Sequence, residues 1–327
     1  PEGEAGGAKR SMASENERSR LDDAARAGWL YYIAGNTQDE IAKRLKVSRA
    51  TAQRLVSLCL KERLITFRLE HQIAAGKELA ARLQECFGLA HCEVAPTNPA
   101  APNAVGGIAE RAAALLEATL RAEKPAIVAI GTGRTMRAAV EQVPPMDCPN
   151  HQIVSLVGNI SPDGSASFFD ALARLTDLTK VRHYPMPLPV FVASDSERQQ
   201  LLKLGPVSRV RAIAAKADLR LVGIGQIDQS AQVYVDGFIT HDELLEMLRL
   251  GAVGEVAGWA MDAEGRVIDG GTNRRLTSVP LPVPAKALTV GAALGRSKLP
   301  GIRAALKGRI INGLITDEAT AQALLKE

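Results

Sequence analysis

The chain of 327 residues is long enough for two domains, since single domains usually span about 100–200 residues. Its composition, 46% hydrophobic and 23% charged, is typical of a globular protein that buries real cores. No apolar run approaches the roughly 18 residues that cross a membrane. The small, polar residues 1–18 lack the features of a signal peptide. We therefore expect a disordered tail over 1–18 and a cytoplasmic protein that does not contact a membrane.

The cysteines predict neither a metal site nor a disulfide framework. Cys59, Cys86, Cys92 and Cys148 form no Cys-x-x-Cys pair and lie near no histidine cluster. This usage fits a reducing compartment. We expect no metal and no cofactor.

Positive charge is concentrated in one stretch near the start of the chain. Residues 43–68 carry eight Lys and Arg side chains against Glu62 alone, a net charge of +7, whereas the whole chain is at +4. Such a block is expected where a protein contacts a phosphate backbone. The alternative, a solvated helix face, would usually mix the two signs.

The same region predicts a helix-turn-helix. A helix over 22–34 ends at Gly35-Asn36, and Thr37-Gln-Asp-Glu40 forms a capping box that begins a short helix. After Lys46-Val47, Ser48 caps a longer helix. This order of helix, tight turn and helix is typical of DNA-binding proteins, and residues 64–69 could add a small wing. A three-helix bundle without DNA-binding function is the alternative, because any such bundle can show these helices.

The longer helix separates an apolar face from a polar one. Ala52, Leu55, Val56, Cys59 and Leu60 follow helical spacing and are predicted to face the core. The opposite side carries arginine and glutamine, which can pair with guanine and adenine edges. The candidate DNA-binding residues are Gln38, Ser48, Arg49, Ala50, Thr51, Gln53 and Arg54.

Beyond this domain (19–70) we predict a linker helix over 71–83 and an α/β domain over 84–327. Apolar strands alternate with amphipathic helices, which predicts a doubly wound parallel sheet covered on both faces. The predicted strands are 125–130, 152–157, 219–224 and 287–292. The predicted helices are 108–121, 135–143, 168–179, 195–203, 207–216 and 298–307, with a proline-rich stretch over 183–190.

In such sheets ligands bind beyond the carboxyl ends of the strands, and several turns are predicted there. The turn Gly131-Thr132-Gly133-Arg134-Thr135 opens a helix and can cradle a phosphate or hydroxyl cluster, although a plain tight turn is an equal alternative. Lys298 lies at a helix start, where a bound anion would explain a cation better than the helix dipole does. A solvent-facing lysine is the alternative. The other candidates at strand ends are Gly158, Asn159, Gly223 and Gly225, and Asp163, Asp236 and His183 are weaker ones.

The chain from about Arg20 onward resembles the SorC (SorC/DeoR-like) family of sugar-responsive regulators. The matching residues are Tyr31-Tyr32-Ile-Ala-Gly35, Gln38-x-x-Ile41-Ala42-x-x-Leu45, Val47-Ser48-Arg49-Ala50-Thr51-x-x-Arg54-Leu55 and Gly251-Ala-Val-Gly-Glu255-Val-Ala-Gly. Lys46 departs from the family, which usually has glycine in that turn. A lysine there must accept a less favourable backbone conformation or use a different turn, at a cost of about 1 kcal/mol.

The resemblance implies an effector domain similar to sugar-phosphate isomerases. It implies that Gly131–Thr135 and Lys298 hold the ligand's phosphate or terminal hydroxyls and that Glu255 receives ligand hydroxyls. The ending Gly308-x-x-Ile-Asn312-Gly-Leu-Ile-Thr316-Asp-Glu318 is also similar, and we interpret Thr316 as the cap of the last helix.

The expected protein is thus a non-enzymatic, ligand-responsive regulator of a carbohydrate or polyol operon. Its expected partners are operator DNA, a sugar, polyol or sugar-phosphate effector, and further copies of itself in a homodimer or homotetramer. One alternative is a sugar-phosphate isomerase that carries a DNA-binding domain, with Glu255 as general base. Another, a protein-interaction module, predicts no salt-sensitive DNA affinity.

Overall fold

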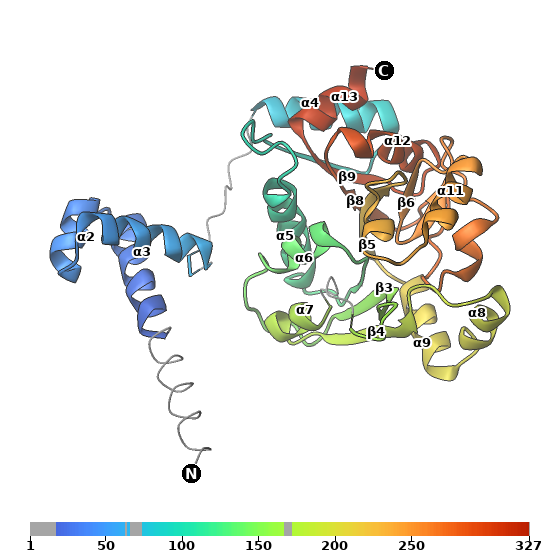
Figure 1. The fold of residues 1–327 in the computed structure, drawn as a ribbon, viewed down its shortest axis with the longest axis horizontal. Coiled ribbons are helices and arrows are strands. Elements are labelled where there is room, and N and C mark those ends of the chain that lie inside the picture. Colours follow the sequence, from blue (N-terminus) through green and yellow to red (C-terminus); the bar gives the residue numbers. More distant parts are fainter. Residues whose placement is uncertain (1–17, 63, 66–73, 167–171, 327) are drawn as a thin grey trace, which may run out of the picture. The chain divides into compact units, whose positions relative to one another are not determined.

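The computed structural model describes residues 18–62, 64–65, 74–166 and 172–326. The described residues divide into two compact units, one up to residue 65 and one from residue 74 (Figure 1). We call them the N-terminal unit and the effector unit. Of the expected tail, residues 1–17 lie outside the described residues.

The N-terminal unit has the predicted helices and caps. An α-helix over residues 18–28 continues as the short π-helix η1 (Trp29–Ile33). The helices α2 (Gln38–Leu45) and α3 (Arg49–Lys61) follow. The capping box is formed, because the Glu40 amide donates to Thr37 Oγ1 at 3.3 Å and the Thr37 amide donates to Glu40 Oε2 at 2.8 Å. The small core of the unit consists of Ala27, Leu30, Ile41, Ala42, Ala52 and Val56.

Two details of this unit qualify the sequence prediction. Lys46 adopts the left-handed conformation (φ 56°, ψ 42°), which costs a non-glycine residue about 1–2 kcal/mol. Leu60, predicted to face the core, is 40% exposed, because it lies at the margin of the arc of α3 that the other helices cover. Leu64 and Ile65 form a bend, and residues 66–69 of the predicted wing lie outside the described residues.

The effector unit is built on a sheet of nine strands. Seven of them are parallel in the order β1-β9-β8-β5-β2-β3-β4, and an antiparallel hairpin of β6 and β7 extends from β5. The strands are β1 (His91–Ala95), β2 (Ile127–Ile130), β3 (Gln152–Ile160), β4 (Arg182–Pro189), β5 (Leu219–Gln226), β6 (Gly254–Val256), β7 (Trp259–Met261), β8 (Leu288–Ala292) and β9 (Gly313–Asp317).

Helices cover both faces of this sheet, as a doubly wound fold requires (Figure 1). On one face, α5 (Gly106–Leu120), α6 (Arg134–Val140) and α7 (Leu172–Thr179) pack against one buried core. On the other face, α4 (Ala74–Phe87), α9 (Gly205–Ala215), α12 (Leu299–Lys307) and α13 (Glu318–Lys326) contribute to a second core. Successive strand residues alternate between the cores, since Val128 and Ile130 join the first and Ala129 joins the second.

Shorter elements complete the unit. They are α8 (Asp195–Leu201), α10 (Gln232–Val235), α11 (His241–Arg249) and the 3-10 turns η2 (Gly271–Arg275) and η3 (Arg296–Lys298). The segment that carries α10, α11 and the hairpin has its own small core around Leu244, Met247 and Ala260.

The sequence did not predict β1, β4, β9 or the hairpin strands β6 and β7. Thr316 lies in β9 and does not cap the final helix; Asp317 does so, because its Oδ1 accepts from the Thr320 amide at 3.1 Å. The proline-rich stretch forms β4, which is an edge strand, the position in a sheet where proline is tolerated.

Two strands extend further than predicted, and this changes the setting of four candidate residues. Gly158 and Asn159 lie inside β3, and Gly223 and Gly225 lie inside β5, so none of them is in a turn after a strand. At Gly158 the neighbouring β4 approaches so closely that a Cβ atom would be 2.5 Å from the Leu188 carbonyl oxygen. The pairing of β3 with β4 shifts register on either side of this residue.

Glycine at position 254 is required for the packing of β6 against α12. A Cβ atom at Gly254 would lie 2.5 Å from the Gly301 Cα atom, so Gly254→Ala should lower the free energy of unfolding by about 1–3 kcal/mol. Gly106→Ala is the control, because a Cβ atom there meets nothing within 4 Å and should leave stability equal or slightly higher. Urea unfolding followed by circular dichroism measures both, and equal stability of the two variants would contradict the expectation.

Candidate functional site

The exposed side of α3 carries most of the predicted DNA-binding residues. Arg49, Ala50, Gln53 and Arg54 are exposed, and Ser48 precedes them at the exposed N-cap. The Ser48 hydroxyl accepts from the Thr51 amide at 3.1 Å and lies 2.9 Å from Thr51 Oγ1. These two hydroxyls therefore fix the start of α3.

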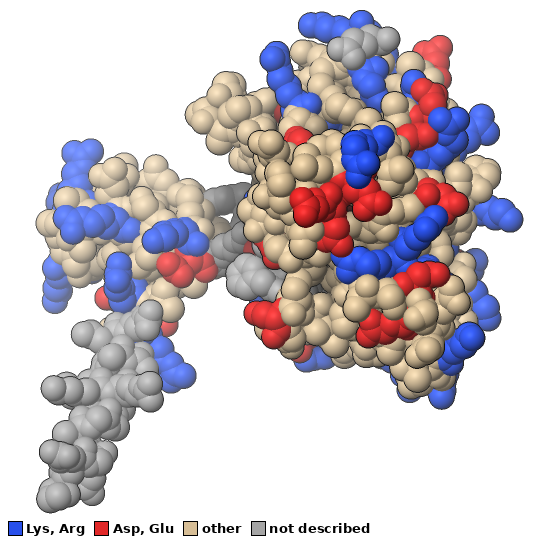
Figure 2. Space-filling model, turned by 45° about the vertical axis from the view of Figure 1, so that its right-hand side comes forward, with Lys and Arg blue, Asp and Glu red and all other residues tan. Residues whose placement is uncertain are grey.

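Charge on this unit is mainly positive, and Figure 2 shows more Lys and Arg than Asp and Glu side chains over it. Arg49 is linked to α2 by an ion pair, in which its Nε lies 3.5 Å from Asp39 Oδ1. Both side chains are more than half exposed, so the pair contributes little to stability and leaves the guanidinium able to reach a phosphate. Gln38, at the start of α2, is partly buried.

In the effector unit, the glycine-rich turn lies directly between β2 and α6. The Gly131 amide donates to the Leu221 carbonyl at 2.9 Å, which holds the turn against β5. Gly133 is the N-cap of α6 with φ 112°, a conformation that favours glycine. The Thr135 side chain is buried, whereas Thr132 is partly accessible and its carbonyl faces Gly223.

Glu255 is positioned by the pairing of β6 with the end of β5. Gly225 lies opposite Glu255 in the antiparallel register, and a Cβ atom at Gly225 would lie 2.1 Å from Glu255 Oε1. The carboxylate therefore lies over the glycine. Its Oε2 accepts from the Gly258 amide at 2.7 Å.

The positive charge of Lys298 contributes to the electrostatic environment of this carboxylate. Burial raises the pKa of Glu255, while the Gly258 amide and the positive charge of Lys298 act to lower it. Burial lowers the pKa of Lys298, against the attraction of Glu255, and the charge of Arg134 lowers it further. The charge of Lys298 thus acts on Glu255, and the charge of Arg134 acts on Lys298. Carboxylate oxygens accept hydrogen bonds from ligand hydroxyls, and the cations donate to hydroxyl or phosphate oxygens.

Lys298 occupies the predicted position at a helix start, as the last residue of η3 and the N-cap of α12. The preceding turn depends on Gly295, which has φ 104°. A Cβ atom at Gly295 would lie 3.2 Å from Asn103 Oδ1, so Asn103 is next to this turn. The sequence did not indicate Asn103, because it lies in the loop before α5, far along the chain.

The remaining candidates differ in their surroundings. Asn159 Oδ1 is buried and accepts no hydrogen bond from the described residues. Asp163 is bound locally by Ser165, and its pKa is lowered by that contact. Asp236 accepts from Gln232 on its own short helix, and His183 is exposed on the edge strand β4. The last three are therefore not brought to the Glu255 carboxylate.

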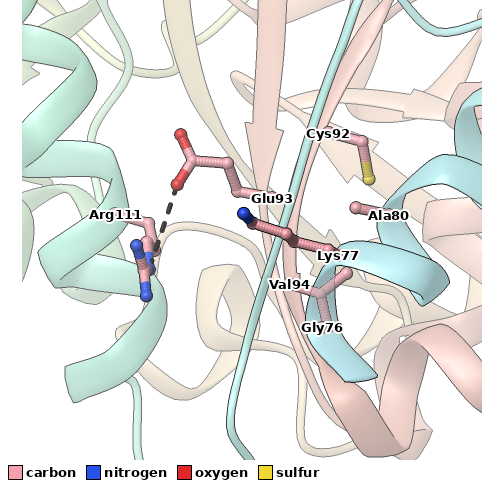
Figure 3. Close-up of a pocket in the computed structure, with 7 residues that line it drawn as sticks. All are labelled: Gly76, Lys77, Ala80, Cys92, Glu93, Val94 and Arg111. Atoms are coloured by element: carbon pink, nitrogen blue, oxygen red, sulfur yellow. Dashed lines mark ion pairs between the residues drawn. The ribbon is translucent and has the colours of Figure 1, made fainter. Parts of the chain in front are cut away.

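A small cavity lies elsewhere in the effector unit, between α4, β1 and α5 (Figure 3). It measures about 30 Å³, and Arg111 Nε lies 3.9 Å from Glu93 Oε2 at its wall. Its lining residues are Gly76, Lys77, Ala80, Cys92, Glu93, Val94 and Arg111. A space of this size holds about one water molecule, so it is not a sugar site.

Two properties of the described residues bear on other functions. No helix among them is both long and apolar enough to cross a membrane. No group of three or more His, Cys, Asp or Glu side chains among them is arranged to hold a metal ion.

Comparison with known proteins places this architecture in a family. A family model described as a putative sugar-binding domain matches residues 71–326. The erythritol catabolism regulatory protein EryD of Brucella abortus (strain 2308) is 32% identical over 302 residues, which cover 92% of this chain and 96% of that protein. The transcriptional regulator LsrR of Escherichia coli (strain K12) is 30% identical over 325 residues, covering 97% of this chain and 98% of LsrR.

A solved structure supports the fold. The full-length sorbitol operon regulator SorC from Klebsiella pneumoniae aligns with a TM-score of 0.68 at 23% identity, covering 94% of this chain and 99% of that one. Fold, helix-turn-helix and relatives together define a DNA-binding transcriptional regulator with a sugar-binding domain. The chain belongs to the SorC family of sugar-binding transcriptional regulators.

Glu255→Gln tests whether burial penalises the charged carboxylate. Because the pKa of Glu255 is raised above its ordinary value of 4.5, the folded protein loses stability as pH increases from 4.5 through the raised pKa. Glutamine cannot ionise. The stability of the variant relative to wild type should therefore change little below pH 4.5 and increase as pH rises above it.

Urea unfolding of both proteins over a pH series measures this difference, in which the effects of groups that do not interact with residue 255 cancel. The titration of Lys298, which Glu255 influences, is followed at the alkaline end of the series. A relative stability of Glu255→Gln that falls with rising pH would show that the folded protein favours the ionised carboxylate, and would contradict the expectation.

Proposed function

We propose that the protein is a DNA-bound switch whose affinity for its operator is set by a sugar, sugar alcohol or sugar phosphate. The observation that carries the proposal is the Glu255 carboxylate, which β6 holds over Gly225 near the end of β5 and on which the charge of Lys298 acts. The regulated genes would serve carbohydrate or polyol catabolism, in line with the name of the relative EryD.

The proposed effector site combines the Glu255 and Lys298 side chains with the turn Gly131–Thr135 and the strand residues Gly223 and Gly225. The Glu255 carboxylate would accept hydrogen bonds from ligand hydroxyls, and Lys298 and the amides of the turn would donate to a terminal hydroxyl or a phosphate. Gly158 and Asn159 are proposed as further contacts. The buried Oδ1 of Asn159 supports this, since a buried polar atom usually has a hydrogen-bond partner.

On the DNA side, the proposed contacts are Gln38 and the exposed part of α3 with its cap. They are Ser48, Arg49, Ala50, Thr51, Gln53 and Arg54. Because operator half-sites are repeated, we propose a homodimer or homotetramer that presents two such units. The effector would favour one arrangement of the copies, and operator affinity would change by the difference in effector binding between arrangements.

The rival function is an isomerase with a DNA-binding domain. It would need Glu255 as general base together with a second proton-transfer group. The His91 ring contacts Glu93 and the His241 ring contacts Tyr234, so neither is positioned for that role. We therefore propose a sensor without catalysis. Aldose–ketose interconversion that is lost in Glu255→Gln would overturn this proposal.

A thermal-shift screen of the full chain tests the effector class. Sugars, polyols and their phosphates should be compared at equal concentrations, because a ligand at 100 times its Kd stabilises the folded state by about 2.7 kcal/mol. At least one of these compounds should raise the melting temperature. A screen in which none does so would contradict the proposed effector class.

Arg54→Ala tests the DNA-binding surface. Binding to a duplex selected from random sequences by the wild-type protein should weaken about fivefold or more, since an arginine contact to a base contributes about 1–3 kcal/mol. If Arg54 instead contacts phosphate, the slope of log Kd against log salt should fall by about one. Arg209→Ala is the control, because it removes the same charge from an exposed position on α9. Fluorescence anisotropy over a salt series measures both, and equal affinity of the two variants would contradict the assignment.

Gly225→Ala tests the effector site without disrupting the fold. The added methyl group would occupy the place of Glu255 Oε1, and this flexible side chain can move aside at small cost in stability. The affinity for an effector found in the screen should fall about tenfold or more, because a hydrogen bond to a charged group contributes about 1.5–3 kcal/mol. Isothermal titration calorimetry measures the affinity, with Gly106→Ala as control. Unchanged affinity in Gly225→Ala would place the effector elsewhere.

A further inference from the structure

Helix α11 has a wider apolar arc than its own unit covers. Leu244 and Met247 are buried in the small core beside the hairpin, whereas Leu245 is 43% exposed and Leu248 is 38% exposed. Val235, on the neighbouring α10, is 61% exposed. The two helices meet where the Tyr234 and His241 rings lie 5.9 Å apart. On α11 itself, Leu245 and Leu248 are three residues apart and therefore neighbours on the helix surface, and adjoining exposed apolar side chains mark an interaction surface.

The charges on the same side of α11 have opposite signs at its two ends. Asp242 is exposed at the N-terminal end and Arg249 at the C-terminal end, seven residues or about two turns apart. Residues at this spacing lie on one side of a helix, and Leu245 lies between them. Neither Asp242 nor Arg249 forms an ion pair within the described part of the chain. Glu243, by contrast, is used internally, because it pairs with Arg275 and closes the Thr240 capping box.

A surface with an acid at one end, leucines in the middle and a base at the other end is complementary to itself when two copies run antiparallel. We propose that α11 packs against α11 of a second copy of this chain across a two-fold axis near Leu245. Asp242 of each copy then faces Arg249 of the other, and Leu245 and Leu248 pack between the two charge pairs. The inference rests on the proposed assembly of copies and specifies the surface that forms it.

The size of this surface sets the strength of the association, and its position in the chain places it close to Glu255. Two short helices bury less than the roughly 800 Å² per partner of a standard interface, so association through α11 alone is weak and depends on concentration. Figure 1 shows α11 at the rim of the effector unit. The helix ends at Arg249, and β6 begins at Gly254 directly before Glu255. A ligand held by Glu255 therefore acts one short turn away from the contact between copies.

Charge reversal provides the sharpest test. Asp242→Arg and Arg249→Asp should each lower the association constant of the full chain about tenfold or more, because each brings like charges together twice per pair of copies. The double variant should return to within about threefold of wild type. An equimolar mixture of the two single variants should also associate, because one copy then carries only cations at these positions and the other only acids. Sedimentation velocity over a concentration series measures all four samples.

Leu245→Glu should weaken association by a similar factor, and Leu204→Glu serves as its control because Leu204 is 49% exposed elsewhere on the effector unit. A wild-type chain that stays monomeric, an unchanged mass for Leu245→Glu, or a double variant as weak as the single ones would each overturn the proposal. An unchanged mass would mean that something other than a second copy covers the leucines. Effector and operator binding are measured separately, so their persistence in that case would leave the proposed switch intact.

Discussion

The candidate effector site depends on one constraint, the antiparallel pairing of β6 with the end of β5. This pairing lays the Glu255 carboxylate over Gly225, at the edge where the parallel strands end. The carboxylate can take this position because small residues lie on both sides of the hairpin. Gly225 leaves room for the carboxylate, and Gly254 lets β6 approach Gly301 of α12. The parallel strands form this edge of the sheet, and the hairpin places the Glu255 carboxylate there.

The charges at this edge are only partly compensated in the free protein. Burial disfavours both the ionised Glu255 and the ionised Lys298, and their mutual attraction opposes this effect. Charged groups in such surroundings are stabilised by any partner that brings hydrogen bonds with it. In the proposed switch, a polyhydroxylated effector supplies those bonds. The hairpin connects α11 to the sheet and packs on α12. A shift of the hairpin would therefore also move α11, which lies at the surface of the unit.

The N-terminal unit was largely predictable because its signals are local. Thr37 with Glu40, and Ser48, act within one helical turn, and the apolar spacing of α3 identified most of its buried face. Leu60 was misplaced because spacing alone does not tell how wide an arc the neighbouring helices cover. Lys46 stands where the family usually has glycine, and it adopts the left-handed conformation that glycine favours. The lysine therefore does not require a different kind of turn.

In the effector unit, the parallel strands that consist of apolar runs were predicted from the sequence. The parallel strands that contain polar residues or prolines were not. His91–Ala95 contains polar residues, β4 contains prolines, and Thr316-Asp317 has the composition of a helix cap although it ends β9. The site could not be derived from the local sequence pattern. Glu255 meets Gly225, 30 positions earlier in the chain, through the pairing of β6 with β5, and no sequence signal near either residue predicts that pairing. Family resemblance indicated Glu255 and Lys298, and the structure supplied their common surroundings.

The central claim is that effector binding changes DNA affinity. The most direct measurement is the Kd of the full chain for its selected operator duplex, at fixed salt, with and without a saturating concentration of the compound that most raises the melting temperature. The account predicts a change of at least about fivefold, the lower range of allosteric coupling. An operator Kd that is the same in both conditions would contradict it.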